Sequence, residues 1–282
     1  MKFNFIISSA LFGVSSTSPT LLLKRQGGAA AASGDGPYGA VAVSTDAALA
    51  NHAIYVPTTT NATGTAKWPV LVWGNGGCSS DGASNARFLG AVASYGCLVI
   101  ASGAPASTNK GQTTAAMMTA SIDFAVKVAG TGKYANVDAT KIMAAGFSCG
   151  GVEAMAMSWD SRVKTIGVFS SGLLTNYTAA SSFTKPVVFI IGGSGDIAYQ
   201  NAERDFKALP SATPSWKGNL PLGHGGDLFQ ANGGKFGRAG IAWLEYIFRG
   251  NETAKNYFVA DGYKADGWQV EAHALDQLKP FV

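Results

Sequence analysis

The sequence predicts an α/β protein with a mostly parallel central sheet of about eight strands and helices on both faces. Short apolar runs alternate with helical segments along the chain, which is typical of parallel strands joined by crossover helices. The chain has 282 residues, of which 47% are hydrophobic and 13% are charged, so it can bury one large core. We expect a single domain over 40–250, followed by a C-terminal extension over 251–282.

The strands are predicted from short apolar runs bounded by turn residues, and the helices from apolar residues at helical spacing. The predicted strands are 38–43, 52–56, 69–74, 97–101, the run that starts at Lys141, 165–169, 187–191 and an extended piece at 216–220. The predicted helices are 83–95, 113–128, the segment that follows Ser148, 199–206 and 237–248. The C-terminal extension carries no motif, and it contains one candidate short strand at 266–270.

The N-terminus is typical of a targeting segment. A positive start, a short apolar stretch and a zone of small residues predict a signal peptide over 1–18. A short pro-segment over 19–25 would end at the dibasic pair Lys24-Arg25, and 26–39 would be a flexible, glycine-rich lead-in with nothing to pack against. The alternative is a buried N-terminal helix followed by two surface cations. We expect a secreted, extracellular protein.

Three N-x-[ST] sequons agree with a secretory route and predict glycosylation in surface loops at Asn61, Asn176 and Asn251. After the leader, no apolar run reaches the roughly 18 to 20 residues of a membrane span, so we expect no integral membrane segment. The net charge of +4 comes from scattered Lys and Arg, so the sequence has no basic cluster that would indicate nucleic-acid binding. We expect a monomer.

The strongest functional signal is the segment Gly146-Phe147-Ser148-Cys149-Gly150, a G-x-S-x-G motif. An apolar run precedes it, and a helical segment that opens with small residues follows it. A serine becomes a useful nucleophile when a tight strand-to-helix turn presents its hydroxyl alone, above a helix N-terminus. The motif is common in ordinary loops, so it is the strand-turn-helix context that makes Ser148 the candidate nucleophile.

A nucleophilic serine needs a base, and an acid that holds the base in one tautomer. His224 is favoured as the base because it lies in a glycine-flanked loop, whereas His52 falls in a strand pattern and His273 in the C-terminal extension. Asp196 is the candidate acid because it follows a late apolar run, at the sheet edge where catalytic groups of open α/β sheets gather. Two alternatives stay open: Asp196 as a helix cap, and Asp227 as the acid.

Attack on a carbonyl also needs backbone N–H groups that receive the developing oxyanion. One should come from Cys149, the residue after the candidate nucleophile. The other should come from Gly76 or Gly77, in the glycine-rich loop after the central strand. The alternative for this loop is a flexible turn with no catalytic role.

The order Ser148, Asp196, His224 is nucleophile, acid, base, which among triad enzymes is the order of α/β-hydrolases. The chain resembles secreted fungal α/β-hydrolases of the dienelactone-hydrolase and chlorophyllase-like group, and is distantly similar to cutinase-like bacterial polyester hydrolases. The segments that carry the resemblance are 73–78, 146–151, 192–198 and 216–226. The resemblance implies an α/β-hydrolase fold and ester hydrolysis through an acyl-enzyme, with no metal and no organic cofactor.

The chain departs from these relatives in two ways. Dienelactone hydrolases use a cysteine nucleophile, where this chain has Ser148. The polyester hydrolases carry an aromatic clamp in the first oxyanion loop and just before the nucleophile, and those places hold Asn75 and Phe147 here. We expect Phe147, Trp216 and Phe169 to form the substrate wall, with a place in the core as the alternative for each.

The prediction from these residues is a serine carboxylic ester hydrolase, whose partner is an ester substrate, either a small molecule or a polymer. Thioester, peptide and lactone substrates are narrower alternatives. A different class of function is a non-catalytic secreted binding or host-interaction protein on the same scaffold. The presence of all three residues Ser148, Asp196 and His224 argues against that class, because a non-catalytic protein does not require a nucleophile, an acid and a base.

The three cysteines leave one thiol over if a disulfide forms, as is common in secreted proteins. Cys78 and Cys149 each follow a strand and so lie at the catalytic edge, whereas Cys97 begins its strand at the opposite edge. A five-residue strand spans roughly 16 Å, well beyond the Cα separation of about 7 Å that a disulfide tolerates. We predict a Cys78–Cys149 disulfide and a buried free Cys97. The alternative is three free thiols.

Overall fold

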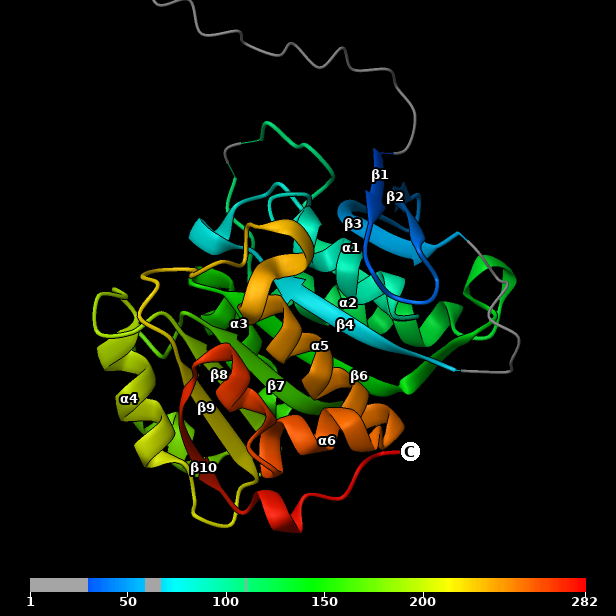
Figure 1. Ribbon diagram of the computed structural model, residues 1–282. Coiled ribbons are helices and arrows are strands. Elements are labelled where there is room, and N and C mark those ends of the chain that lie inside the picture. The colour runs from blue at the N-terminus through cyan, green and yellow to red at the C-terminus, as the bar shows by residue number, and fades with distance from the viewer. Residues whose placement is uncertain (1–29, 59–66, 110) are drawn as a thin grey trace, which may run out of the picture.

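The computed structural model describes residues 30–58, 67–109 and 111–282, in which strands and helices alternate along the chain (Figure 1). The strands are β1 Ala30–Ser33, β2 Ala40–Asp46, β3 Leu49–Pro57, β4 Trp68–Gly74, β5 Leu98–Ser102, β6 Val137–Phe147, β7 Val163–Phe169, β8 Val187–Ile191, β9 Ser215–Asn219 and β10 Gln269–His273. The α-helices are α1 Ala86–Ser94, α2 Ala115–Val128, α3 Cys149–Ala156, α4 Tyr199–Ala208, α5 Gly234–Arg249 and α6 Glu252–Val259. Each strand and helix predicted from the sequence is present, with ends that differ by a few residues.

The strands within the described residues form one sheet in the order β1-β2-β3-β5-β4-β6-β7-β8-β9-β10. The run from β5 to β9 is parallel throughout. Antiparallel pairings add β3, β2 and β1 at one edge and β10 at the other. The predicted α/β class and mostly parallel sheet are therefore confirmed. The described residues form ten strands, more than the predicted number of about eight.

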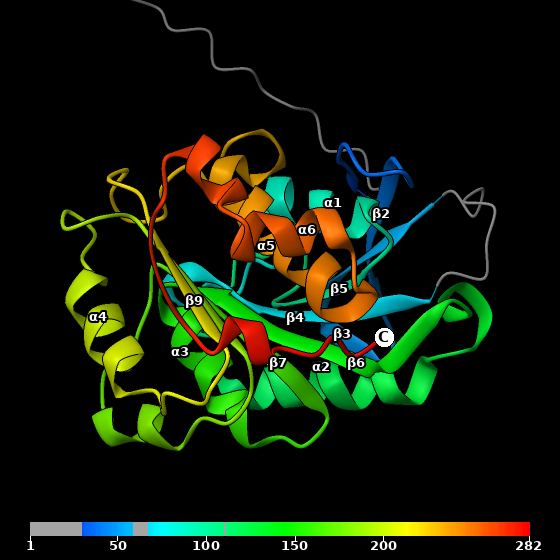
Figure 2. The same cartoon turned by 60° about the horizontal axis from the view of Figure 1, so that its bottom comes forward.

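Helices cover both faces of the sheet, with α1, α5 and α6 on one side and α2 and α3 on the other (Figure 2). The core on the first side contains Phe88, Trp243 and Phe258, and the core on the second contains Met118 and Met155. Strands β4, β5 and β8 are buried along their whole length, which explains why they are continuous apolar runs in the sequence. Among the described residues, no helix has the length and apolar character needed to cross a membrane.

The N-terminal lead-in is more ordered than the sequence suggests. The prediction that 26–39 packs against nothing is wrong for its described part, because β1 pairs with β2 along its whole length. The turn after β1 also lies against α1, where the Gly36 amide donates to Ser94 Oγ at 3.0 Å. The predicted signal peptide, the pro-segment and the sequon at Asn61 lie outside the described residues.

The C-terminal segment packs into the core. Phe258 of α6 and Trp268, just before β10, both pack edge-on against Trp216 of β9. The strand predicted at 266–270 is present as β10, which extends the sheet beyond β9. The segment over 251–282 therefore adds to the core on the α5 side of the sheet. The candidate nucleophile, Ser148, lies between β6 and α3, and α3 covers the other side.

Candidate active site

Ser148 lies at a strained turn between β6 and α3. Its backbone has φ 52° and ψ −121°, a conformation that a residue with a side chain adopts at a cost. The turn is tight, since a Cβ at Gly146 would overlap the carbonyl of Gly150, and a Cβ at Gly150 would overlap the backbone of Gly74. The glycines of the motif are therefore required by close backbone approach, and the serine is presented at the start of a helix.

Ser148, His224 and Asp196 lie in one line of hydrogen bonds at the carboxyl edge of the sheet. The Ser148 hydroxyl donates to His224 Nε2 at 2.9 Å, and His224 Nδ1 donates to Asp196 Oδ1 at 2.7 Å. The Asp196 side chain is fully buried, whereas the imidazole is 26% exposed. The arrangement can take a proton from the serine while the carboxylate holds the imidazole tautomer.

The Asp196 carboxylate is held in its ionised form. Burial opposes ionisation, but hydrogen bonds from Ser170, from His224 and from the amides of Ala198 and Gly192 outweigh it, so the pKa of Asp196 lies below its ordinary value. A buried carboxylate that keeps its charge can stabilise an imidazolium when the ring takes up a proton. The bond from the Ala198 amide lies in the turn before α4, whose N-cap is Ala198 with no side-chain cap bond, so the alternative of Asp196 as the cap of this helix is wrong.

The other candidate base and acid residues, His52, His273 and Asp227, lie elsewhere in the fold. His52 is buried in β3, where its Nε2 bonds to a backbone carbonyl of α2 at 3.0 Å and burial lowers its pKa. His273 lies in β10, on the far strand of the sheet. Asp227 accepts hydrogen bonds from the amides of Lys235 and Phe236, at the start of α5. Asp227 therefore caps α5, and the acid that contacts His224 is Asp196.

The predicted oxyanion donors lie on two segments that are joined covalently. Cys149 is the first residue of α3, so its amide is among the helical N–H groups that have no acceptor within the helix. The 3₁₀ turn Gly76–Cys78 follows β4, and the predicted disulfide links Cys78 to Cys149 with a Cα separation of 5.2 Å. The Gly150 amide also donates to the Asn75 carbonyl at 3.0 Å. The turn is therefore held beside the N-terminus of α3 by one covalent bond and one hydrogen bond.

The prediction for the three cysteines is confirmed. Cys78 and Cys149 are bonded, and Cys97 is a buried free thiol at the start of β5. Burial raises the pKa of the Cys97 thiol to about 12, so it stays protonated and behaves as a small apolar core residue.

A cleft of about 230 Å³ opens beside the candidate nucleophile. Its lining residues are Ser148, Cys149, Val152, Ser170, Ser171, Gly172, Leu174, Ile197, Ala198, Asn201 and His224. Two of the apolar side chains project into solvent at the rim, since Leu174 is 57% exposed and Ile197 is 81% exposed. These two residues follow β7 and β8, so the sequence signal that could have identified them is their position just after the strand ends that carry Ser170 and Asp196.

The predicted substrate wall is wrong for all three of its aromatic residues, since none of them lines the cleft. Trp216 and Phe169 are fully buried, because both side chains belong to the hydrophobic core on the α5 side of the sheet. Phe147 is almost buried, and its ring packs against the His224 ring at a centroid distance of 5.0 Å and against Phe229 at 5.5 Å. Phe147 therefore packs against the imidazole and helps to hold it in position.

Sequence reasoning also missed a buried carboxyl group behind the candidate oxyanion turn. Glu153 of α3 accepts a hydrogen bond from the Thr113 hydroxyl at 2.9 Å, while its Oε2 is buried with no hydrogen-bond partner in the described part of the chain. The Thr113 amide in turn donates to the Cys78 carbonyl at 2.9 Å. Burial, opposed only by the Thr113 bond, raises the pKa of Glu153.

Comparison with known proteins assigns no family to this chain, since no family model matches it and a search of curated proteins found no match. Among the described residues, no group of three or more His, Cys, Asp and Glu side chains is placed to hold a metal ion.

Proposed function

We propose that the chain is a serine hydrolase with the α/β-hydrolase fold, which cleaves carboxylic esters through an acyl-enzyme intermediate. The observation that carries the proposal is the continuous relay from Ser148 Oγ through His224 to Asp196, with hydrogen bonds of 2.9 and 2.7 Å. The strained strand-to-helix turn and the order of the three residues along the chain support the same class.

The reaction follows from the positions of the protons. His224 Nε2 accepts the hydroxyl proton as Ser148 Oγ attacks the ester carbonyl, and the imidazolium is stabilised by the Asp196 carboxylate. The same nitrogen then gives its proton to the leaving alkoxide, and an alcohol departs. Water next attacks the acyl-serine with His224 as base, and the carboxylic acid is released as Ser148 recovers its proton.

The Cys149 amide and an amide of Gly76 or Gly77 are the proposed oxyanion donors. Each such donor typically contributes about 3 to 4 kcal/mol to the stability of the transition state, provided that it is already in place before the reaction. The disulfide between Cys78 and Cys149 supports this role, since it joins the two segments that carry the donors.

The cleft favours an uncharged, apolar acyl group. Val152, Leu174 and Ile197 supply apolar walls, and no Asp, Glu, Lys or Arg stands among the residues that line the cleft. A charged acyl group would lose its hydration there without gaining a partner. The small size of the cleft, about 230 Å³, favours short acyl chains over long ones.

The test is hydrolysis of p-nitrophenyl esters of increasing acyl length by the wild type, Ser148→Ala and His224→Ala. We expect kcat/KM to be highest for short acyl chains, and each substitution to lower kcat by on the order of 10⁴-fold or more. No hydrolysis by folded wild-type protein would favour the non-catalytic binding protein. Activity that persists in Ser148→Ala would place the nucleophile elsewhere.

Secretion is part of the proposal. The N-terminal targeting pattern, the sequons and the disulfide support it, because disulfides persist mainly in oxidising compartments. Expression of the full chain in a eukaryotic host tests it directly. We expect the protein in the medium with an N-terminus near Gln26, and retention in the cell with Met1 intact would contradict the assignment.

A further inference from the structure

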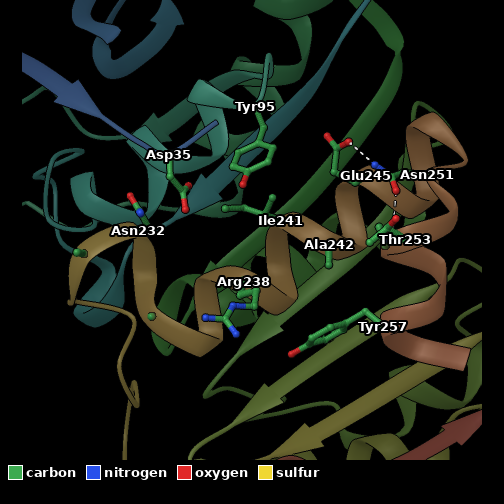
Figure 3. Close-up of a pocket in the computed structure, with 13 residues that line it drawn as sticks. Asp35, Tyr95, Asn232, Arg238, Ile241, Ala242, Glu245, Asn251, Thr253 and Tyr257 are labelled. Carbon is green, nitrogen blue, oxygen red and sulfur yellow. Dashed lines mark hydrogen bonds between the residues drawn. The ribbon is translucent and has the colours of Figure 1, made fainter. Parts of the chain in front are cut away.

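A second cavity, of about 480 Å³, lies on the side of the sheet covered by α1, α5 and α6 (Figure 3). Its walls come from five parts of the chain: the turn after β1, the C-terminal end of α1, the 3₁₀ turn Ala231–Gly233, helix α5 and helix α6 with the residue before it. Ile241, Ala242 and Ala254 contribute apolar surface. The cavity belongs to a different face from the cleft at Ser148, and the two share no lining residue.

The polar groups around this cavity suit a neutral, polyhydroxylated ring. Tyr95 and Tyr257 present aromatic rings, and burial raises the pKa of both, so neither phenol ionises at physiological pH. The Tyr257 hydroxyl donates to Asp266 at 2.9 Å and accepts from Trp268 at 2.7 Å, so this residue offers its ring to the cavity.

Two of the three charged side chains in the lining are paired within the protein, Arg238 with Asp266 and Glu245 with Arg249. The third, Asp35, is hydrogen-bonded to Tyr95 and offers carboxylate oxygens that can accept from sugar hydroxyl groups. Aromatic rings beside hydrogen-bonding groups and an apolar floor match a pyranose, which has apolar C–H faces and hydroxyl groups at its edge.

A sequon lies on the rim of the cavity. Asn251 and Thr253 of Asn251-Glu252-Thr253 both line it. The Asn251 Oδ1 atom accepts a hydrogen bond from the Ala254 amide at 3.1 Å and so caps α6. The Nδ2 atom, which would carry a sugar, points toward Glu245 in the cavity wall, 3.4 Å from its Oε2, as Figure 3 shows.

Modification of Asn251 is compatible with this geometry. Attachment of a sugar replaces one of the two hydrogens on Nδ2 and leaves Oδ1 free to accept, so the cap of α6 would be kept. Because Nδ2 already points at the cavity wall, a sugar joined to it would begin at the cavity.

We propose that Asn251 carries an N-linked glycan whose innermost N-acetylhexosamine lies in the cavity between Tyr95 and Tyr257. A lipid-pyrophosphate oligosaccharide donor of the secretory route supplies the sugar. The C–N bond forms between its C1 and Asn251 Nδ2, the C1–O bond to pyrophosphate breaks, and one Nδ2 proton is lost. The inference rests on secretion and is independent of the proposed esterase activity.

Asn176 provides an internal control. It is an exposed residue just before the 3₁₀ turn Tyr177–Ser182, and it lines neither the cavity nor the cleft. A glycan at Asn176 would extend into solvent, whereas the innermost sugar of the proposed Asn251 glycan would be covered by the walls of the cavity. The two sites should therefore differ in their access to enzymes that cleave the sugar–asparagine bond.

The test is site-resolved mass spectrometry of the full chain secreted by a glycosylating eukaryotic host, during digestion with a peptide-N-glycosidase. If the inner sugar lies in the cavity nine-tenths of the time, release from Asn251 in the native protein is about tenfold slower than from Asn176. After denaturation the two rates become equal. An unmodified Asn251 in the secreted protein, or equal native rates, overturns the proposal.

Three variants give a second readout. Tyr95→Ala should speed the native release from Asn251, whether or not Asn176 is occupied. Thr253→Ala destroys the sequon but keeps the Asn251 cap, and Thr253→Ser keeps both. Relative to wild type, Thr253→Ala should lower the melting temperature of protein from the glycosylating host but not of protein made in bacteria, and Thr253→Ser should lower neither. No host-dependent difference for Thr253→Ala, or unchanged native release in Tyr95→Ala, contradicts a docked glycan.

Discussion

The Ser170 hydroxyl oxygen accepts a hydrogen bond from the Gly225 amide at 3.0 Å. Ser170 is fully buried at the end of β7, and its hydroxyl donates to Asp196. Gly225 follows His224, so one side chain ties the histidine loop to the acid that the histidine contacts. Ser170 holds this position at φ 41°, in the left-handed region that a residue with a side chain adopts at a cost.

We predict that Ser170→Ala lowers kcat with little change in KM, because it removes a donor to Asp196 and leaves the Gly225 amide without its partner. A hydrogen bond to a charged group contributes about 1.5 to 3 kcal/mol, which corresponds to a loss of roughly ten- to a hundredfold. Ester hydrolysis by Ser170→Ala and by an exposed control, Ser181→Ala, checks the prediction. Equal kcat for wild type and Ser170→Ala would show that the relay does not need this support.

Gly76 and Gly77, the two glycines of the proposed oxyanion turn, should respond differently to alanine. A Cβ at Gly76 would lie 2.5 Å from the Phe147 ring, which packs on His224, whereas a Cβ at Gly77 would meet nothing within 4 Å. Gly76→Ala must displace the ring and should lower kcat by more than about tenfold, whereas Gly77→Ala meets only the strain of φ 62°, about 1 kcal/mol. Steady-state kinetics of both variants test this, and a larger loss in Gly77→Ala would contradict the packing account.

The disulfide should contribute to both stability and activity. It closes a loop with a sequence separation of 71 residues, for which the chain-entropy model gives about 4 kcal/mol. We expect the Cys78→Ser/Cys149→Ser double variant to unfold at a lower denaturant concentration and to lose kcat, because the two segments that carry the proposed oxyanion donors are no longer joined. Urea unfolding and ester hydrolysis measure the two effects. An unchanged unfolding midpoint would show that the bond adds no stability.

The buried Glu153 should make stability depend on pH. Its pKa is raised in the folded protein, so its stabilising contribution is complete below the pKa of the unfolded chain, about 4.3, and is lost as pH rises through the folded value. Glu153→Gln removes this loss while keeping the bond from Thr113. The melting temperature of Glu153→Gln relative to wild type should therefore increase as pH rises above about 4.3. A difference that stays constant with pH would contradict the shifted pKa.

Much of the fold and of the site's position follows from patterns in the sequence. Strands buried on both faces are continuous apolar runs, so the ranges around Leu71, Ile100 and Phe189 are recognisable without coordinates. The carboxyl ends of parallel strands share one edge, which brings Ser148 and Asp196 together. The disulfide follows from the same rule, because only two of the three cysteines lie at that edge.

Side-chain burial could not be obtained in this way. The sequence alone does not show that Trp216 and Phe169 belong to the core and not to the substrate wall, because that depends on which face of the sheet each side chain takes. Leu174 and Ile197 stand in irregular segments, where their position after the strand ends indicates nearness to the site but no periodicity shows that they form its wall. The role of Ser170 depends on a contact across two loops, for which sequence spacing carries no signal.

The measurement that tests the central claim most directly is the reaction of the folded protein with a fluorophosphonate, followed by intact mass and peptide mapping. The account predicts one adduct per chain, located on Ser148, absent in Ser148→Ala and formed much more slowly in His224→Ala. No adduct on folded wild-type protein, or an adduct on another residue, would contradict the assignment of Ser148, His224 and Asp196 as a catalytic relay.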